Sequence, residues 1–476
     1  METPASPNTV DDHKTKTDRG NGWVDDLTGP ALLELQTNTG VTFTQASSYF
    51  TMYNLAHIFG SLSTGFLSGR LSPYISLTFS LGMIAVSSVT ISLLESYLGM
   101  MGAFACLGVS TGVMETVIFA EVAGLWGSDT GVPMHAVWFS KDFGSMLSPF
   151  SITPFLRQIN SSDEAMITST SPLTSGVSNN YNMSLANKLH AEFSRKSVKA
   201  LSPSKLIFPF GISACIALLA LMLFIVLSLV SHFNKFKIIY NHDEDKQRYG
   251  LTGRYLYMAL FFIGLLSALD TGIDDAFVDF ISYYCVIQMD WPSRNSAYVL
   301  SLYNASCALG TFCGVMYAKF DLSPTKLAIT HTMITIMGFC GLILSGIYIL
   351  NVGIWISSFL AGFGHSVIWT LVCVIAEERF FLITGKIASF IVILSCLGSA
   401  VNAPFISYFM EHVSNMYFGY ILLTERSLCL VLIIWSIDLV WLTGKSNDSF
   451  VGDKLGKNNY SSTSSTHEIQ TMIQRQ

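Results

Sequence analysis

Four aspartates stand inside one long apolar segment of the chain: Asp270, Asp274, Asp275 and Asp279. An ionised side chain near the centre of a bilayer costs at least about 2.5–3.5 kcal/mol, so acids in such segments usually bind something. On a helix, Asp270 and Asp274 share one face, whereas Asp275 and Asp279 point roughly the opposite way. We therefore expect Asp270 and Asp274 to hold a coupling ion, either Na⁺ at Asp274 or a proton, or to accept hydroxyl groups of a bound solute. Asp275 and Asp279 are expected at the outer mouth of the segment, in water.

A second set of charges lies in the two segments 98–126 and 132–156. Glu115 belongs to the first of these, and Lys141 and Asp142 belong to the second. Lys141 and Asp142 are adjacent on a helix and cannot face each other. Pairing Lys141 with Glu115 on the neighbouring helix is the least costly way to keep both charged. Such a pair is either a coupling or gating pair or a static structural pair inside the bundle.

Two short signatures occur twice at a nearly constant offset. The first pair of matches is 250 residues apart and the second is 254 residues apart. A constant offset in an apolar chain is typical of a two-fold repeated membrane carrier with its site between the halves. The matching residues are Tyr53-Asn54 with Tyr303-Asn304, Gly60-Ser61 with Gly310-Thr311, Thr130-Gly131 with Thr384-Gly385, and Gly144-Ser145 with Gly398-Ser399.

The repeat pairs residues that differ in chemistry. It overlays Glu115 on Trp369, and a carboxylate opposite an indole can hold a sugar by hydroxyl bonds on one side and ring stacking on the other. Packing alone is the alternative reading of Trp369. The pairs Tyr53-Asn54 and Tyr303-Asn304 either line a pocket or act as polar contacts between helices.

Composition places the chain in a membrane. Charged residues make up 12% and hydrophobic residues 51% of the sequence, whereas soluble chains carry roughly 25% charged residues. No basic stripe for nucleic acid, no phosphate-binding loop and no soluble-enzyme motif is present, so we expect neither an enzyme nor a nucleic-acid partner. The nine cysteines all fall in apolar segments, which gives no sign of a disulfide framework.

Hydropathy predicts an all-α polytopic protein with about eleven full membrane spans. The spans are expected at 47–69, 74–95, 98–126, 132–156, 205–231, 254–285, 295–318, 326–350, 352–376, 385–410 and 416–443. The repeat offset predicts a further first helix, of which only Trp23–Leu35 is apolar. Thirteen helical residues reach about 20 Å, short of a core of about 30 Å, so the first helix is expected to be truncated.

These spans divide the chain into five regions. They are a polar tail (1–22), an N-terminal bundle (23–231) with an outward loop (157–204), a cytoplasmic linker (232–253), a C-terminal bundle (254–443) and a polar cytoplasmic tail (444–476). Bases in the short loops cluster on one face, which the positive-inside rule makes cytoplasmic. Asn160 and Asn182 lie in glycosylation tripeptides of the outward loop. We therefore expect a glycosylated multi-pass protein of the plasma membrane.

Several runs resemble a known family of carriers. The 6+6 pattern with Gly65-x-x-x-Gly69-Arg70 resembles the major facilitator superfamily. The run Gly127–Pro149 after Leu125-Trp126, together with Gly29–Leu35 and Thr271–Asp274, is similar to its sodium-dependent glucose transporter branch, the domain-containing 4 group. The resemblance implies a small-molecule solute, glucose and Na⁺ coupling.

The chain departs from that branch inside the expected solute site. His135 and Trp138 stand where the branch usually has Gln and His, and Lys141-Asp142 replace an apolar residue and a glycine. The resemblance places His135 and Trp138 among the solute-binding candidates, although a lone helical histidine is more often an interior residue.

These observations lead to one expected function and its alternatives. We expect a secondary carrier that moves a small polar solute, such as a hexose, by alternating access, with Na⁺ or H⁺ as coupling ion and no other cofactor. One alternative is a transport-inactive truncated isoform or a carrier-derived receptor or scaffold. Another is a carrier of a different solute, an organic anion or an amino compound.

Overall fold

The computed structural model describes residues 23–24, 26–67, 72–126, 131–157, 204–234, 254–320, 322–379 and 385–435, and their regular elements are all helical. Each of the eleven expected spans contains a helix. These helices are α3 (Phe43–Leu67), α4 (Pro73–Leu93), α5 (Tyr97–Trp126), α6 (Gly131–Ile152), α9 (Ile207–Asn234), α10 (Arg254–Met289), α11 (Ser293–Lys319), α12 (Pro324–Tyr348), α13 (Asn351–His365) with α14 (Ile368–Arg379), α15 (Gly385–His412) and the last helix, Tyr417–Trp435.

The chain is an integral multi-pass membrane protein. Within the described ranges, nine helices are long and apolar enough to cross a bilayer. The stretch Ile207–Leu227 of α9 has a mean hydropathy of 2.8 with only 33% of its residues buried, as expected for a helix that faces lipid. Helices α3 and α6 are not among the nine, and both lie between other helices at the centre of the bundle.

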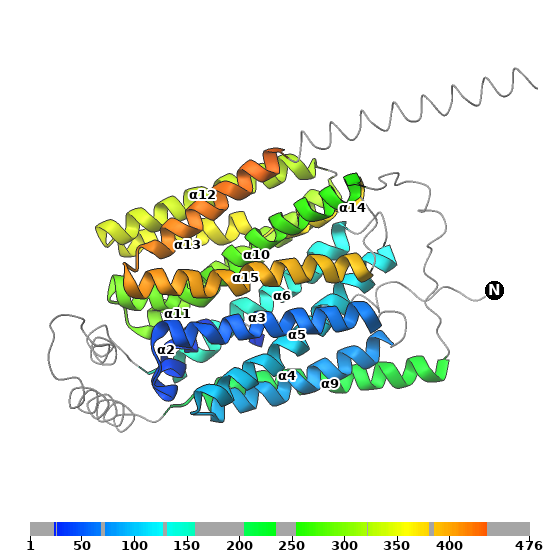
Figure 1. Cartoon of the computed structure of the whole chain (residues 1–476), viewed down its shortest axis with the longest axis horizontal. Helices are drawn as coiled ribbons and strands as arrows, with labels where there is room; N and C mark the ends of the chain where they lie inside the picture. Colours follow the sequence, from blue (N-terminus) through cyan, green and yellow to red (C-terminus); the bar gives the residue numbers. More distant parts are fainter. Residues whose placement is uncertain are drawn as a thin grey trace, which may run out of the picture.

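The helices lie side by side in one elongated bundle (Figure 1). The halves of the chain meet most extensively in two helix pairs, α3 against α15 and α6 against α11. Within each half, glycines let backbones approach closely, because a Cβ on Gly108 would collide with the Tyr53 carbonyl and one on Gly398 with the Ala268 carbonyl. Gly108 thus joins α5 to α3, and Gly398 joins α15 to α10.

The expected short first helix is present, but its bounds differ from the prediction. Helix α2 runs over Thr28–Thr39 and all twelve of its residues are buried. It ends at Gly40, which adopts the left-handed conformation (φ 65°) that closes many helices. Its buried Glu34 accepts hydrogen bonds from the Arg157 backbone N–H (2.5 Å) and the Ser204 hydroxyl (2.9 Å), which anchors α2 to the ends of the neighbouring elements.

The ninth expected span is broken in two. Helix α13 ends at His365 and α14 begins at Ile368, with a turn at Ser366 and Val367. The Ser366 hydroxyl donates to the Phe363 carbonyl (2.9 Å), so a side chain replaces part of the helical hydrogen bonding. Broken helices in membrane carriers commonly line a binding cavity.

Four predicted regions lie wholly or largely outside the described residues. They are the N-terminal tail (1–22), the outward loop with Asn160 and Asn182, the linker (232–253) and the C-terminal tail (444–476).

Candidate functional site

A cavity of about 140 Å³ lies between the two halves of the chain. The first half supplies wall residues from α2, α3, α5 and α6, and the second half from α10, α11, α13, α14 and α15. Ten of the predicted site residues line it: Tyr53, Asn54, Glu115, Trp138, Lys141, Asp142, Asp270, Asp274, Asn304 and Trp369.

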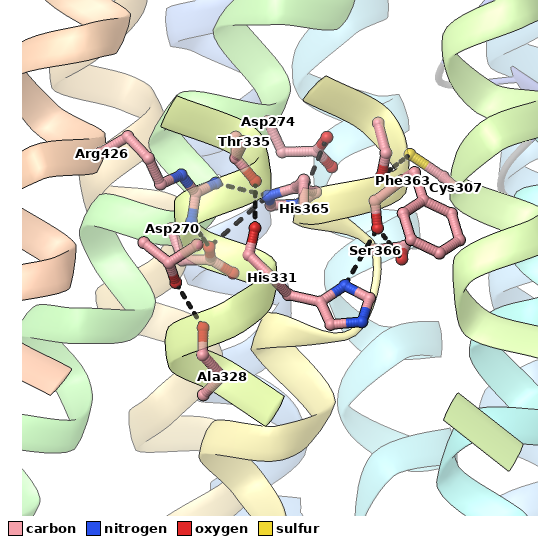
Figure 2. Close-up of polar contacts among 12 residues, drawn as sticks. Asp270, Asp274, Cys307, Ala328, His331, Thr335, Phe363, His365, Ser366 and Arg426 are labelled. Carbon is pink, nitrogen blue, oxygen red and sulfur yellow. Dashed lines mark hydrogen bonds and ion pairs between the residues drawn. The ribbon is translucent and has the colours of Figure 1, made fainter. Parts of the chain in front are cut away.

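A buried arginine organises the second-half wall (Figure 2). Arg426 of the last helix is fully buried, and its Nη1 donates to Asp270 Oδ1 at 2.6 Å. Its Nη2 lies 2.6 Å from His365 Nδ1. A buried arginine with a carboxylate and an imidazole on separate nitrogens is held in one orientation.

The arginine also fixes the tautomer of His365. Because a guanidinium only donates hydrogen bonds, His365 Nδ1 must accept, and the proton of the neutral ring lies on Nε2. His365 Nε2 lies 3.4 Å from Asp274 Oδ1. His365 therefore connects the buried Arg426–Asp270 pair to Asp274 (Figure 2), and it can gain a second proton only by giving up its contact with Arg426.

Asp274 is the carboxylate of this network that reaches the cavity. Its side chain is 29% exposed, against 1% for Asp270. The Tyr303 hydroxyl donates to Asp274 Oδ1 at 2.6 Å, and the Tyr303 ring stacks on Phe277 with centroids 4.2 Å apart. Asp270 and Asp274 thus share one face of α10, as the sequence predicts.

The first-half wall carries a different set of contacts. His57 Nε2 lies 3.1 Å from Glu115 Oε2, and the Glu115 side chain is 23% exposed. The Lys141 ammonium lies 4.6 Å from the centroid of the Trp138 ring, within cation–π range. The Trp138 and Trp369 rings are 4.7 Å apart, so an indole of each half meets here. The predicted Lys141–Glu115 pair stays a prediction.

Polar side chains cross between the halves at the cavity wall. The Asn304 amide of α11 donates to Asp26 Oδ2 (2.7 Å) and to the Ser145 carbonyl (3.0 Å). The Thr311 hydroxyl, also of α11, donates to Asp142 Oδ2 at 3.0 Å. Asn304 and Asp142 thus join the two halves in this state, in addition to lining the cavity.

Comparison with solved structures identifies the architecture. The chain superimposes on the proton:xylose symporter XylE bound to 6-bromo-6-deoxy-D-glucose with a TM-score of 0.62 and 14% identity, covering 90% of this chain and 95% of that one. A partially occluded inward-open form of the E. coli xylose transporter XylE gives a TM-score of 0.64 at 12% identity, covering 90% of this chain and 98% of that one. The chain has the major facilitator superfamily fold.

Sequence comparison finds distant relatives that match part of the chain. Major facilitator superfamily domain-containing protein 4B of Danio rerio is 28% identical over 129 residues, 27% of this chain and 24% of the relative. Sodium-dependent glucose transporter 1 of Homo sapiens is 27% identical over 124 residues, 26% of this chain and 24% of the relative. No family model matches the chain. The matches span about a quarter of each relative and confirm the resemblance drawn from the sequence; the solved structures are of transporters rather than enzymes.

Three expectations about individual residues need correction or relocation. Asp275 and Asp279 were expected in water at the outer mouth, yet both line the cavity and Asp279 is buried. The cavity therefore extends around more than one face of α10. His135 is buried beside Gly314 and is not among the lining residues. Tyr303 is likewise not among the lining residues, but its hydroxyl donates a hydrogen bond to Asp274, which is.

Three polar residues in or behind the cavity wall were not predicted as site residues. They are His57, His365 and Arg426. A signal for Arg426 was present, because Glu425-Arg426 places two adjacent charges inside an apolar segment. Glu425 accepts a hydrogen bond from the Asn402 amide (3.0 Å), so both charges have partners within the bundle.

Proposed function

We propose that the chain is a secondary transporter that moves a small polar solute, a hexose such as glucose, through the central cavity by alternating access. The observation that carries this proposal is the composition of the cavity wall. Carboxylates, amides and indoles from both halves line one cavity, among them Glu115 of the first half and Trp369 of the second. Hydroxyl groups suit the polar atoms and a sugar ring suits the indoles.

Contacts at both ends of the cavity support alternating access. At one end of α3, the Thr44 backbone N–H donates to Glu411 of α15 (2.7 Å); near the other end, Ser389 of α15 donates to the Ser61 carbonyl (3.1 Å). Helices α6 and α11 likewise meet through two ring pairs far apart along their length, Phe150–Tyr298 and Phe139–Phe312. Release of a solute requires one end of these contacts to separate while the other holds.

The proposed coupling ion is Na⁺ or H⁺ at Asp274. This carboxylate is partly exposed to the cavity, and His365 links it to the buried Arg426. A cation at Asp274 would compete with the Tyr303 hydroxyl and the His365 Nε2–H for the same oxygen. Such competition is a direct way to connect ion binding on α10 to the positions of α11 and α13.

We also propose a topology and a location for the chain. We place two six-helix bundles at 23–231 and 254–443, with α2 as a short first helix, the linker and tails in the cytoplasm, glycans on Asn160 and Asn182, and the protein in the plasma membrane. Xylose and glucose appear in the names of similar proteins, which supports a sugar as the solute.

The test is uptake by the full chain in proteoliposomes. Saturable uptake of labelled glucose above empty vesicles is the expected result, and its absence would contradict transport of glucose. Asp274→Asn should alter the Na⁺ or pH dependence of uptake, whereas Glu95→Gln, an exposed acid outside the cavity, should not. Solute binding without uptake would instead favour a transport-inactive receptor or scaffold.

A further inference from the structure

We propose that the solute recognised by the central cavity carries a positive charge, as a protonated amine does. This inference rests on the proposed transport function and specifies the solute of the same site. A hydroxylated amine, such as an amino sugar, combines this charge with the features that suit a hexose.

The first observation is the balance of charges around the cavity. Seven carboxylates line it, against one lysine and two histidines, His57 and His365. Adding Arg426 behind the wall gives at most four positive charges, so acids outnumber bases by at least three among the described residues when all are ionised. The carboxylates are Asp26, Glu115, Asp142, Asp270, Asp274, Asp275 and Asp279.

The second observation is that buried oxygen atoms of the second-half wall lack hydrogen-bond partners. Asp270 is 1% exposed, and while its Oδ1 binds Arg426, its Oδ2 has no hydrogen-bond partner among the described residues. The Ser395 hydroxyl, on a residue 4% exposed that also lines the cavity, lacks a partner in the same part of the chain. A buried polar atom without a partner is costly, and a bound N–H donor would satisfy it.

The third observation is a cation already resting on the aromatic part of the wall. The Lys141 ammonium lies over Trp138, and Trp369 stands 4.7 Å from that ring. The face of the Trp138 ring is therefore placed to attract a positive charge. A solute ammonium can take the place of the lysine ammonium without any new chemistry in the wall.

These three features distinguish solutes by charge. A carboxylate solute would meet an excess of like charges in a space of low dielectric, which is unfavourable. A neutral hexose gains ordinary hydrogen bonds, whereas an ammonium gains charge-assisted bonds and a cation–π contact. A coupling cation can also occupy the acids, so the test must separate solute charge from ion coupling.

The experiment compares sugars of one shape and different charge. Glucosamine, N-acetylglucosamine, glucose and glucuronate are tested as inhibitors of glucosamine uptake by the full chain in proteoliposomes. The assay runs at about pH 6.5, where the amine is protonated, with equal Na⁺ and pH on both sides. One charge-assisted contact corresponds to at least about a tenfold gain in affinity. We expect glucosamine to bind at least about tenfold tighter than glucose and N-acetylglucosamine, with glucuronate weakest.

Variants of the cavity wall separate an effect of charge from an effect of side-chain packing, because charge predicts the direction in which glucosamine affinity changes. Lys141→Gln removes the internal cation from Trp138 and should strengthen inhibition by glucosamine while leaving that by glucose nearly unchanged. Asp279→Asn should weaken inhibition by glucosamine more than by glucose. Glu95→Gln, the exposed acid outside the cavity, is the matched control and should change neither.

The outcomes separate this inference from the proposed function. Equal affinity for glucose and glucosamine, or a preference for glucuronate, overturns the positive solute while leaving transport standing. Stabilisation of the purified protein against heat by glucosamine and not by glucose, with no uptake of either, supports the charge preference and contradicts transport. Absence of both binding and uptake for all four sugars overturns both.

Discussion

The two walls of the cavity use charge in different ways. In the second-half wall, Arg426 and Asp270 are 0% and 1% exposed, and His365 connects them to Asp274. In the first-half wall, Glu115 is 23% exposed and its described contact is with His57. Both walls present a carboxylate to the cavity, Asp274 at 29% exposure and Glu115 at 23%, but only Asp274 is tied through His365 to a fully buried ion pair.

The difference shows how a repeated fold becomes asymmetric. The repeat places Trp369 where the first half has Glu115, and Ser395-Cys396 where it has Lys141-Asp142. The shared plan fixes backbone positions, while the charges occupy non-equivalent places in the two halves. We infer that the buried network couples an ion to helix movement and that the first-half wall with Glu115 contacts the solute. The following predictions test that division, from the largest effect to the smallest.

The largest effect is expected at Arg426. Arg426→Leu leaves the Asp270 carboxylate buried without its cation, and breaking a buried pair costs about 3–5 kcal/mol. Chemical unfolding in detergent micelles measures this loss. The double variant Arg426→Leu/Asp270→Leu should recover most of it, because no unpaired charge remains. A single variant that unfolds like the wild type would show that the network is not fixed by this pair.

A smaller loss of stability and a clear loss of coupling are expected at His365. His365→Gln removes the imidazole between Arg426 and Asp274, at a cost of about 1–3 kcal/mol for the contacts left unmade. The dependence of uptake on an imposed Na⁺ or pH gradient should disappear. His331→Gln is the control, since His331 contacts the Phe363 carbonyl (3.1 Å) and does not line the cavity. Equal effects of both variants would refute a special role for His365.

A change in the first-half wall, at Glu115, should alter the affinity for the solute rather than the stability of the fold. Glu115→Gln keeps the shape of the side chain, and we expect a change in unfolding free energy below about 1 kcal/mol. The concentration for half-maximal uptake should rise about tenfold, the equivalent of about 1.4 kcal/mol of solute binding. A variant that unfolds as readily as Arg426→Leu, with unchanged affinity, would erase the contrast between the walls.

The smallest effect is expected at the contact between the start of α3 and Glu411 near the end of α15. Glu411 accepts from both the backbone N–H and the hydroxyl of Thr44 at the start of α3. Glu411→Gln keeps an acceptor but removes the charge at a helix N-terminus, worth about 0.3–1 kcal/mol. The population open at this end should rise by up to about fivefold, measured by alkylation of Ser47→Cys. Unchanged alkylation would show that the charge of Glu411 does not hold this end closed.

Much of the fold was predictable because membrane helices follow from local composition. A run of about 20 apolar residues is sufficient to predict a span, and every expected span contains a helix. The break at Ser366 was not predicted, because no proline marks it and the close packing of Gly362 and Gly364 against neighbouring helices depends on tertiary structure. The end of α2 was placed four residues too early for a similar reason, since its polar last turn is buried by the bundle.

The acidic residues of the site could be predicted from the sequence, whereas most of the residues that pair with them could not. Periodicity placed Asp270 and Asp274 on one helix face, and the repeat paired Glu115 with Trp369; all four line the cavity. Periodicity gives directions around one helix but not the extent of a cavity, so the expectation that Asp279 stands in water was wrong, because its side chain is buried. Arg426 was missed because its partners lie 156 and 61 residues away, on α10 and α13.

Protection of a cavity cysteine by solute tests most directly that the space between the halves is the binding site. Cys396 lines the cavity, whereas Cys340 of α12 is exposed outside it. In chains that keep only one of these two thiols, glucosamine or glucose at saturating concentration should slow alkylation of Cys396 about tenfold or more and leave Cys340 unchanged. Saturable uptake with Cys396 alkylated at the same rate in the presence and absence of solute would contradict binding in this cavity.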